Sequence, residues 1–293
     1  PIAITEGELT GYQIGLFYNS ADDFPLLQLG GVNDAEYAPI QLGLLGNIRR
    51  KGSFGPQLAT GFNFSWEGAI FQISGLGNST KNGTLFQLSG FWNSARHVYG
   101  LQITAGFNGD TDIVYGIQLS GIGNFANQGS ALQLAGGFNS GNGYDGSTPV
   151  QLAGVANFGW DDSFLQIAGG FNFAEKRVAF QLAGLFNLGP DQERDYEIQS
   201  PFFQGSVLFN RSENTPIQMA LINYSEERTI LQIGAANIFQ RGNVQIGAYN
   251  SGQLAPGVRM GFMNHGHGGP FQFAAINIHS SGPAYGVSIG AWN

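Results

Sequence analysis

Three histidines near the C-terminal end are the residues best suited to metal chemistry. His265 and His267 flank Gly266, and His279 follows a short distance later. Imidazole nitrogens bind zinc and other transition metals, but a site needs three or four ligands in a fixed geometry. The chain has no cysteine, and this stretch is rich in glycine. We therefore interpret it as a turn between strands and predict no metal site.

Adjacent acidic residues offer the chemistry of calcium binding or of general acid–base catalysis. Three such pairs occur, Asp22-Asp23, Asp161-Asp162 and Glu226-Glu227, and we interpret all three as solvated turns. The stretch 141–146 matches the G-x-G-x-x-G pattern of phosphate-binding loops. With 46 glycines a chance match is expected, and no helix follows to hold a phosphate. We predict no catalytic residue and no cofactor, and the chain is expected not to be an enzyme.

The elements that carry these residues are copies of one short motif, for which residues 180–187 (Phe-Gln-Leu-Ala-Gly-Leu-Phe-Asn) are a good example. There are nineteen copies; seventeen begin with Gln, and all nineteen end with Asn. The spacing is mostly about 13 to 16 residues, which is typical of a repeat architecture. The copies begin at Gln13, Gln28, Gln41, Gln57, Gln72, Gln87, Gln102, Gln118, Gln133, Gln151, Gln166, Gln181, Gln204, Gln218, Gln232, Gln245, Arg259, Gln272 and Ser288.

Each copy alternates with the period of two that is typical of a β-strand. Between Tyr115 and Phe125, one face is apolar throughout, and the other carries amide, hydroxyl and small side chains around Ile122. Short polar connectors such as Asp110-Thr111-Asp112 separate the copies, and we interpret them as solvated turns. We therefore expect one strand of roughly ten residues and one turn in every repeat.

The Gln and Asn rows are the candidate functional residues. Their amides are expected either to line the lumen of a barrel or to form hydrogen-bonded ladders in a stacked fold. The candidates in the central copies are Gln118, Asn124, Gln133, Asn139, Gln151, Asn157, Gln166, Asn172, Gln181 and Asn187.

Composition narrows the class of protein. Charged residues make up only 11% of the chain, against about 25% in typical soluble domains. Of the 32 charged residues, only Arg259 lies inside a Gln-to-Asn core. The net charge of −8 makes a nucleic-acid partner unlikely to be recruited, so none is predicted. No apolar run reaches the length of a transmembrane helix. The start at Pro1 leads us to expect a processed or trimmed product.

Residues 1–293 are expected to form a single repeat array with two sections. In residues 1–210 the Gln-to-Asn spacing is mostly six, and in residues 211–293 it is five. Within one strand, an odd change of spacing would move the Asn to the opposite face unless a bulge absorbed it. From Gln102 to Asn187 the fourth residue after Gln also alternates between glycine and a larger residue, as at Gly106 and Ile122. Antiparallel hairpins predict such a two-repeat unit.

The text Gly-x-Gln-(Leu/Ile)-x-Gly-x-x-Asn resembles the surface-repeat proteins of spirochaetes, Bacteroidota and myxobacteria. Residues 100–103, 116–119 and 243–250 match it well, and the resemblance covers almost the whole chain. It implies an exported protein associated with the cell envelope, at the bacterial outer membrane or cell surface. It implies no catalytic residues.

Two all-β architectures fit these patterns. The first is an antiparallel transmembrane β-barrel of about 18–20 strands, favoured by the apolar face, the aromatic residues at its ends and the low charge. It would be a porin-like or structural envelope protein in contact with outer-membrane lipid, with other envelope proteins as further candidate partners. In this barrel, Asn157 and Asn172 would lie at opposite ends of neighbouring strands, too far apart for a disulfide between cysteines placed there.

The alternative is a stacked parallel β-solenoid, which would act as a surface-exposed adhesin or a filament-forming structural protein. Its main support is the Asn that closes all nineteen copies, because stacking gives every Asn the same neighbours. On balance the sequence favours the barrel. The substrate, the ligand and the oligomeric state are left open by the sequence.

Overall fold

The computed structural model describes residues 11–22, 25–51, 55–141, 148–160, 162–190, 201–254, 257–266, 270–280 and 286–292. All regular elements in these ranges are β-strands, so the all-β prediction is confirmed. Across the same ranges there is no helix that has both the length and the apolar character to cross a membrane.

The chain divides into two compact units, Pro1–Thr148 and Pro149–Asn293. The change in Gln-to-Asn spacing near residue 210 therefore lies inside the second unit. The first unit contains β1 (Gly11–Ala21), β2 (Pro25–Ala35), β3 (Ile40–Arg49), β4 (Gln57–Ala59), β5 (Phe62–Ser65), β6 (Gly68–Ser74), β7 (Gly77–Ser89), β8 (Trp92–Thr104), β9 (Phe107–Val114), β10 (Ile117–Ser120), β11 (Gly123–Ala126), β12 (Leu132–Ala135) and β13 (Phe138–Gly141).

The second unit has the same kind of element. It contains β14 (Val150–Ala153), β15 (Ala156–Gly159), β16 (Ser163–Ala168), β17 (Phe171–Ala174), β18 (Val178–Ala183), β19 (Phe186–Leu188), β20 (Phe203–Ser206), β21 (Phe209–Ser212), β22 (Ile217–Met219), β23 (Ile222–Ile233), β24 (Ala236–Leu254), β25 (Val258–Gly266), β26 (Phe271–His279) and β27 (Val287–Ile289).

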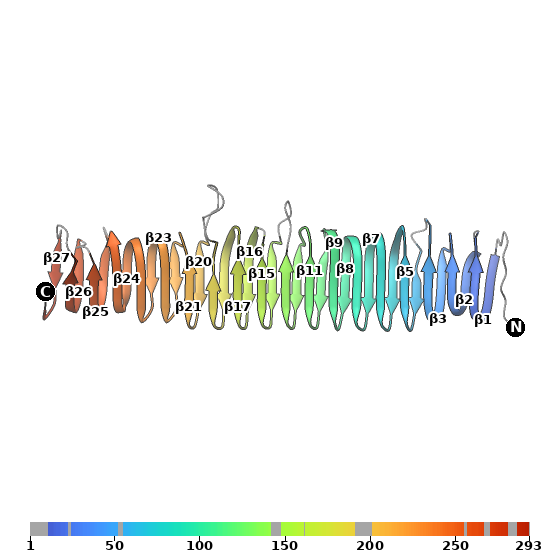
Figure 1. Ribbon diagram of the computed structural model, residues 1–293, viewed down its shortest axis with the longest axis horizontal. Coiled ribbons are helices and arrows are strands. Elements are labelled where there is room, and N and C mark those ends of the chain that lie inside the picture. The colour runs from blue at the N-terminus through green and yellow to red at the C-terminus, as the bar shows by residue number, and fades with distance from the viewer. Residues whose placement is uncertain are drawn as a thin grey trace. The chain divides into compact units, whose positions relative to one another are not determined.

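Strands in each unit pair in parallel with the matching strands of the neighbouring copies (Figure 1). Gln118 of β10 lies opposite Gln102 of β8 and Gln133 of β12. Asn124 of β11 lies in the same way opposite Asn139 of β13. Each repeat is therefore one coil of a parallel β-solenoid. The predicted antiparallel barrel is wrong, and the alternative fold matches the structure.

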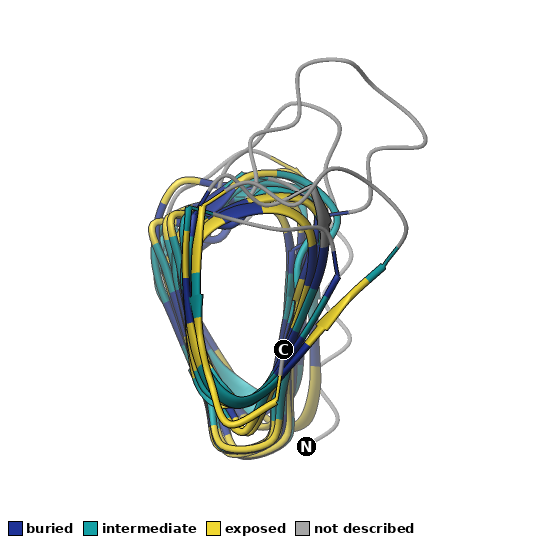
Figure 2. Cartoon of the chain, turned by 90° about the vertical axis from the view of Figure 1, so that its left-hand side faces the viewer, coloured by how far each residue is buried: buried dark blue, intermediate teal, exposed yellow. Residues whose placement is uncertain are grey.

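In the central coils the stretch from Gln to Asn is two short strands joined by a corner, whereas in β1, β2, β3, β25 and β26 one strand of about the expected length runs through both positions. β10 ends at Ser120 and β11 begins at Gly123, with the bend at residues 121–122. The end-on view shows each coil as a flattened loop with two long sides (Figure 2). We call the corner between the Gln strand and the Asn strand the glycine edge. The side that leads from the Asn strand to the next Gln strand is the connector edge.

This corner explains why the change in spacing does not turn the Asn outward. The face of a side chain follows a period of two only within one strand, whereas Gln and Asn lie on different sides of the corner. Asn223 and Asn237, which follow their Gln at the shorter spacing, are as fully buried as Asn124. The argument from strand parity therefore does not apply to these coils.

Tight coil-to-coil approach explains the glycines at the glycine edge. A Cβ atom on Gly121 would lie 2.1 Å from the carbonyl oxygen of Ala105, and one on Gly136 would lie 2.3 Å from that of Gly121. Gly121 and Gly136 hold the third position after their Gln, whereas the alternating residue is the fourth, where Gly106 and Gly137 approach carbonyl oxygens of the preceding coil about as closely. Leu76 and Phe91 hold this fourth position in consecutive coils, so the alternation is confined to part of the chain. The coils that carry the alternation pair in parallel, so its interpretation as antiparallel hairpins is wrong.

The interior is polar and the exterior is apolar, which reverses the usual arrangement. Gln118 and Asn124 are 0% exposed, whereas Ile117 and Phe125 beside them are 38% and 41% exposed. Most buried apolar residues are alanines. The prediction that the two side-chain faces differ in this way is therefore correct. The apolar face, however, lies outside a narrow stack of coils, and not on the lipid side of a wide barrel.

Cysteines at Phe158 and Phe173 should form a disulfide under mild oxidation. The two residues pair in register across β15 and β17, and paired Cα atoms at about 4.8 Å lie within the range that a disulfide allows. The chain has no native cysteine, so a shift on non-reducing gels reports the engineered pair alone.

A control pair at Phe158 and Leu182 joins an Asn strand to a Gln strand two coils away and should stay reduced. Antiparallel strands would place residues 158 and 173 at opposite strand ends. Failure of this pair to cross-link, in a protein that retains strand-rich circular dichroism, would contradict the parallel register.

Candidate functional site

All ten candidate amides lie in the interior of their own unit, and each is 0% exposed. Gln118, Asn124, Gln133 and Asn139 belong to the first unit, and the six from Gln151 to Asn187 belong to the second. They do not face a water-filled lumen, because they bond to one another and to the backbone. What the structure brings together within each unit is two rows of amides, one along each long side of the coils.

The Gln row is a ladder that donates toward the N-terminus. The Nε2 atom of Gln133 donates to Oε1 of Gln118 at 2.9 Å, and Nε2 of Gln118 donates to Oε1 of Gln102 at 3.0 Å. In the second unit, Gln166 and Gln181 repeat the pattern with distances of 2.8 and 2.9 Å. Every such Gln uses its oxygen for the coil that follows and its nitrogen for the coil that precedes.

The Asn row is a ladder of the opposite direction. Nδ2 of Asn124 donates to Oδ1 of Asn139 at 2.9 Å, and Nδ2 of Asn157 donates to Oδ1 of Asn172 at 2.9 Å. The expectation that cysteines at Asn157 and Asn172 could not meet is therefore wrong. Because the Gln and Asn amides point in opposite directions, their dipoles oppose each other along the stack.

Each Asn also bonds to the backbone of two coils. Nδ2 of Asn172 donates to the carbonyl oxygen of Leu182 in the next coil at 2.7 Å and contacts that of Gln166 in its own coil at 3.3 Å. A buried hydrogen bond contributes about 1 kcal/mol net, and an amide left without partners costs about 1 to 3 kcal/mol. The Asn row therefore holds the corner of each coil and fixes the register of the next.

Three of the coils with shorter spacing keep the ladder but change one acceptor. Asn223, Asn237 and Asn250 contact the carbonyl oxygen of the residue three positions before them, at 3.3 to 3.5 Å. In the longer coils this contact goes to the carbonyl of the Gln itself. The loss of one residue is therefore absorbed at the corner, and the Asn-to-Asn bonds are unchanged at 2.9 Å between Asn223 and Asn237.

Arg259 interrupts the Gln ladder, since it occupies a Gln position and is 1% exposed. Its Nη1 and Nη2 atoms donate to the carbonyl oxygens of His265 and Gly252, both at 3.1 Å. Among the described residues, Oε1 of Gln245 and Nε2 of Gln272 have no hydrogen-bond partner. These are the two atoms that a Gln at position 259 would join, so the substitution leaves one orphan on each side of the break.

Asp110 is a buried carboxyl group that the sequence analysis missed. It was interpreted as part of a solvated turn, but it is 7% exposed and accepts hydrogen bonds from Gln102 Nε2 at 3.0 Å, from the backbone N–H of Ala95 at 3.1 Å and from Gln118 Nε2. Burial raises the pKa of Asp110 from 3.8 to about 8, against the opposing effect of these donors.

Arg49 is a buried cation that, like Asp110, lies two residues after the Asn of its coil. Its guanidinium donates to the carbonyl oxygens of Gly55 at 3.0 Å and Gly68 at 2.5 Å. Burial lowers the pKa of Arg49 to about 10, so the group stays charged at neutral pH. The sequence signal for this burial was the offset of two residues from Asn. Ala95 and Thr80 have the same offset in other coils and are also buried.

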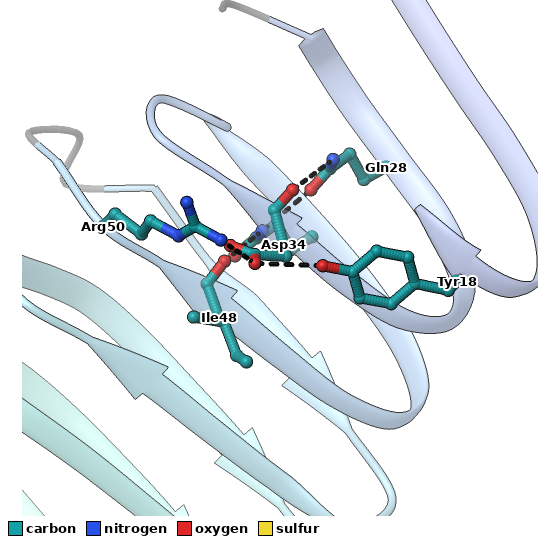
Figure 3. Close-up of polar contacts among 6 residues, drawn as sticks. Tyr18, Gln28, Asp34, Ile48 and Arg50 are labelled. Carbon is teal, nitrogen blue, oxygen red and sulfur yellow. Dashed lines mark hydrogen bonds and ion pairs between the residues drawn. The ribbon is translucent and has the colours of Figure 1, made fainter. Parts of the chain in front are cut away.

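A third polar group in the first coils joins the buried Asp34 to the more exposed Tyr18 and Arg50 (Figure 3). Asp34 accepts a hydrogen bond from the hydroxyl of Tyr18 at 3.1 Å and forms an ion pair with Arg50. Its backbone carbonyl accepts from Nε2 of Gln28 at 3.3 Å. The hydrogen bond to Asp34 raises the pKa of Arg50. The group ties three consecutive coils together on the outside of the Asn ladder.

The residues first considered for metal or acid–base chemistry are not brought together. His265 and His279 lie on neighbouring strands, with His265 opposite Ile278 and Gly266 opposite His279. His267, Asp23, Asp161 and most of the stretch 141–146 lie outside the described residues. Within the described ranges, no group of three or more His, Asp or Glu side chains could hold a metal ion.

The chain matches no protein-family model, no curated protein and no solved structure.

Replacing Arg259 by Gln should reconnect the Gln ladder and stabilise the second unit. The new amide would donate to Gln245 and accept from Gln272. Both unsatisfied buried atoms would then be paired, which should raise the free energy of unfolding by about 1 to 3 kcal/mol in total. Equilibrium unfolding in urea measures the change. Arg259→Met is the control, because it removes the charge and leaves the ladder broken. An equal gain in both variants would show that the ladder break carries no energetic cost.

The stability of the first unit should fall as the pH rises through about 8. Because folding raises the pKa of Asp110, the folded state binds the proton more tightly than the unfolded state. The resulting stability is fully present below about pH 4 and is lost as the pH rises through the folded pKa. Asp110→Asn should flatten this dependence, by an amount on the order of a few kcal/mol between pH 5 and pH 9.

Thermal or urea unfolding at pH 5, 7 and 9 measures the effect. Asp112→Asn is the matched control, because Asp112 is a partly exposed neighbour that pairs with Arg96 at 3.2 Å. The account of Asp110 is wrong if wild type and Asp110→Asn show the same slope with pH.

Proposed function

We propose that the chain is a non-enzymatic structural protein of a bacterial cell surface, in which a stack of amide-laddered coils acts as a stable scaffold. The observation that carries this proposal is that hydrogen-bonded amide side chains fill the interior of the coils. The Gln and Asn side chains of successive coils are fully buried and bond to one another. The interior is thus occupied by groups that fix the register of the coils.

The same observation argues against a porin-like role. Transport through a protein requires a lined, water-accessible path. In both units the amides expected to line that path are 0% exposed, and their donors are directed at neighbouring amides and carbonyls. The proposal therefore keeps the structural alternative predicted from the sequence and abandons the pore.

Location at the cell surface is supported by the resemblance of the Gly-x-Gln-(Leu/Ile)-x-Gly-x-x-Asn text to bacterial surface-repeat proteins. It is also consistent with the distribution of charge, which lies in the connectors. A repeated coil presents the same outer positions many times along one direction, which suits a scaffold that displays or spaces other envelope components.

Surface location can be tested by cysteine labelling in cells that make the full-length protein. Lys81→Cys, at an exposed position of β7, should react with a membrane-impermeant maleimide in intact cells. Thr84→Cys in the same strand is the matched control; Thr84 is 1% exposed, and the cysteine should react only after denaturation.

Labelling of Lys81→Cys that appears only after the cells are lysed would refute the proposed location. In a planar bilayer the purified protein should also produce no ion channels, and reproducible channels would refute the structural role.

A further inference from the structure

The described charged residues of the first unit avoid one edge of its coils. The only charged residue inside any Gln-to-Asn core is Arg259, and it belongs to the second unit. In the first unit the glycine edge therefore carries no charge, whereas Arg50, Lys81, Arg96 and Asp112 lie toward the connector edge. Each coil of this unit is amphipathic from edge to edge.

The glycine edge exposes large apolar side chains to the outside. Leu45, Leu76, Phe91 and Ile122 occupy the same corner position in different coils of the first unit, and all four are exposed. The long sides next to this corner are apolar as well, for example at Leu58, Phe62 and Leu134. The uncharged surface therefore continues around the corner from one long side to the other.

Backbone N–H groups at this edge are hydrogen-bonded within the protein and do not need water as a partner. The N–H groups of Leu76, Phe91 and Ile122 donate to carbonyl oxygens of the preceding coil, at 2.8, 2.9 and 3.1 Å. Backbone groups in contact with hydrocarbon must be paired within the protein, since each unpaired group costs several kcal/mol there. The corner meets this requirement, which an ordinary solvent-exposed turn does not have to meet.

We propose that the glycine edge of the first unit inserts into one leaflet of a lipid bilayer, with the connector edge at the headgroups. This inference rests on the proposed surface scaffold and names what the scaffold binds. A flat second copy would cover one long side and leave the corner exposed. Acyl chains can surround the corner and both long sides together, which is the surface that the structure leaves uncovered.

The dimensions agree with one leaflet. About four residues separate Gln118 from the corner, and at roughly 3.3 Å per residue they span about 13 Å. Half of the hydrocarbon core of a bilayer is about 15 Å thick. The part of a coil between its Gln and its glycine edge is therefore about as deep as one leaflet, so insertion of this part does not cross the membrane.

Two tryptophans of the first unit can be used to measure which edge of the coils faces the lipid. Trp92 directly follows the corner residue Phe91 and is 40% exposed, and Trp66 lies just after β5 at the connector edge and is 44% exposed. Lys81 Nζ lies 3.2 Å from the centroid of the Trp66 ring, which keeps a charge beside that indole. The two indoles are thus equally exposed and lie at opposite edges.

The experiment measures fluorescence of single-tryptophan variants, made by Trp→Phe replacement of the other three, with phosphatidylcholine vesicles. Acyl chains brominated near their ends should quench Trp92 by about twofold or more and leave Trp66 nearly unchanged, while aqueous iodide should quench Trp66 alone. Equal quenching of both tryptophans, or of neither, by brominated lipid overturns the inference.

Matched substitutions test which edge binds. Phe91 and Tyr115 are 58% and 60% exposed, at the glycine edge and near the connector edge respectively. Phe91→Glu should weaken vesicle binding at least about tenfold, and Tyr115→Glu should not. Circular dichroism establishes that both variants are folded. Equal effects of the two substitutions would overturn the proposed orientation.

The outcomes separate this inference from the proposed function. A protein that does not bind vesicles, whether monomeric or associated with further copies, overturns leaflet insertion, while surface labelling of Lys81→Cys still supports the scaffold. Vesicle binding accompanied by ion channels would leave the lipid contact in place and refute the structural role.

Discussion

The hydrogen bond between identical amides in adjacent coils is the interaction on which the rest of this structure depends. A Gln or Asn side chain has a donor and an acceptor at the same end, so a row of them is satisfied when each is stacked on its own kind. The contacts of Gln118 with Gln102 and Gln133 show this geometry. One coil slipped by one residue would turn every amide in it outward. The ladders therefore select both the parallel direction and the register.

Filling the interior with amides moves the apolar residues to the outside. The coil is flattened, so each strand has one narrow inner face and one outer face. Gln and Asn occupy the inner face together with small residues such as Ala95, and Leu, Ile and Phe are left on the outer face. A soluble monomer seldom exposes a continuous apolar surface of this kind. The inverted arrangement thus connects the ladders with the lipid contact proposed above.

Charged residues in the interior show how much variation the ladders tolerate. Arg49 and Asp110 lie beside the ladders, two residues after an Asn, and find carbonyl, amide or hydroxyl partners without interrupting the amide rows. Arg259 replaces a rung, and it leaves Gln245 and Gln272 each with an unsatisfied amide atom. The position of a charge therefore matters more than its burial, because only a rung has neighbours that depend on it.

Much of the local structure follows from the sequence alone. Alternation with a period of two indicates that these residues form strands, and that within a strand Ile117 and Gln118, like Asn124 and Phe125, lie on opposite faces. The Asn that closes every copy already indicated a ladder. The same alternation, however, is compatible with parallel and antiparallel neighbours, because the period of a strand does not depend on the direction of its partner.

Only the tertiary structure decided the direction of the strands, the corner at Gly121 and the burial of Asp110. Direction is set by hydrogen bonds between residues about fifteen positions apart, such as Asn124 and Asn139, and no local pattern contains them. In coils such as that of Gln118 and Asn124, the corner places Gln and Asn on two strands, so the rule of alternation within one strand does not connect them. A turn was expected after Asn108, but β9 continues through Asp110 and pairs with β8. This pairing places the Asp110 side chain in the interior.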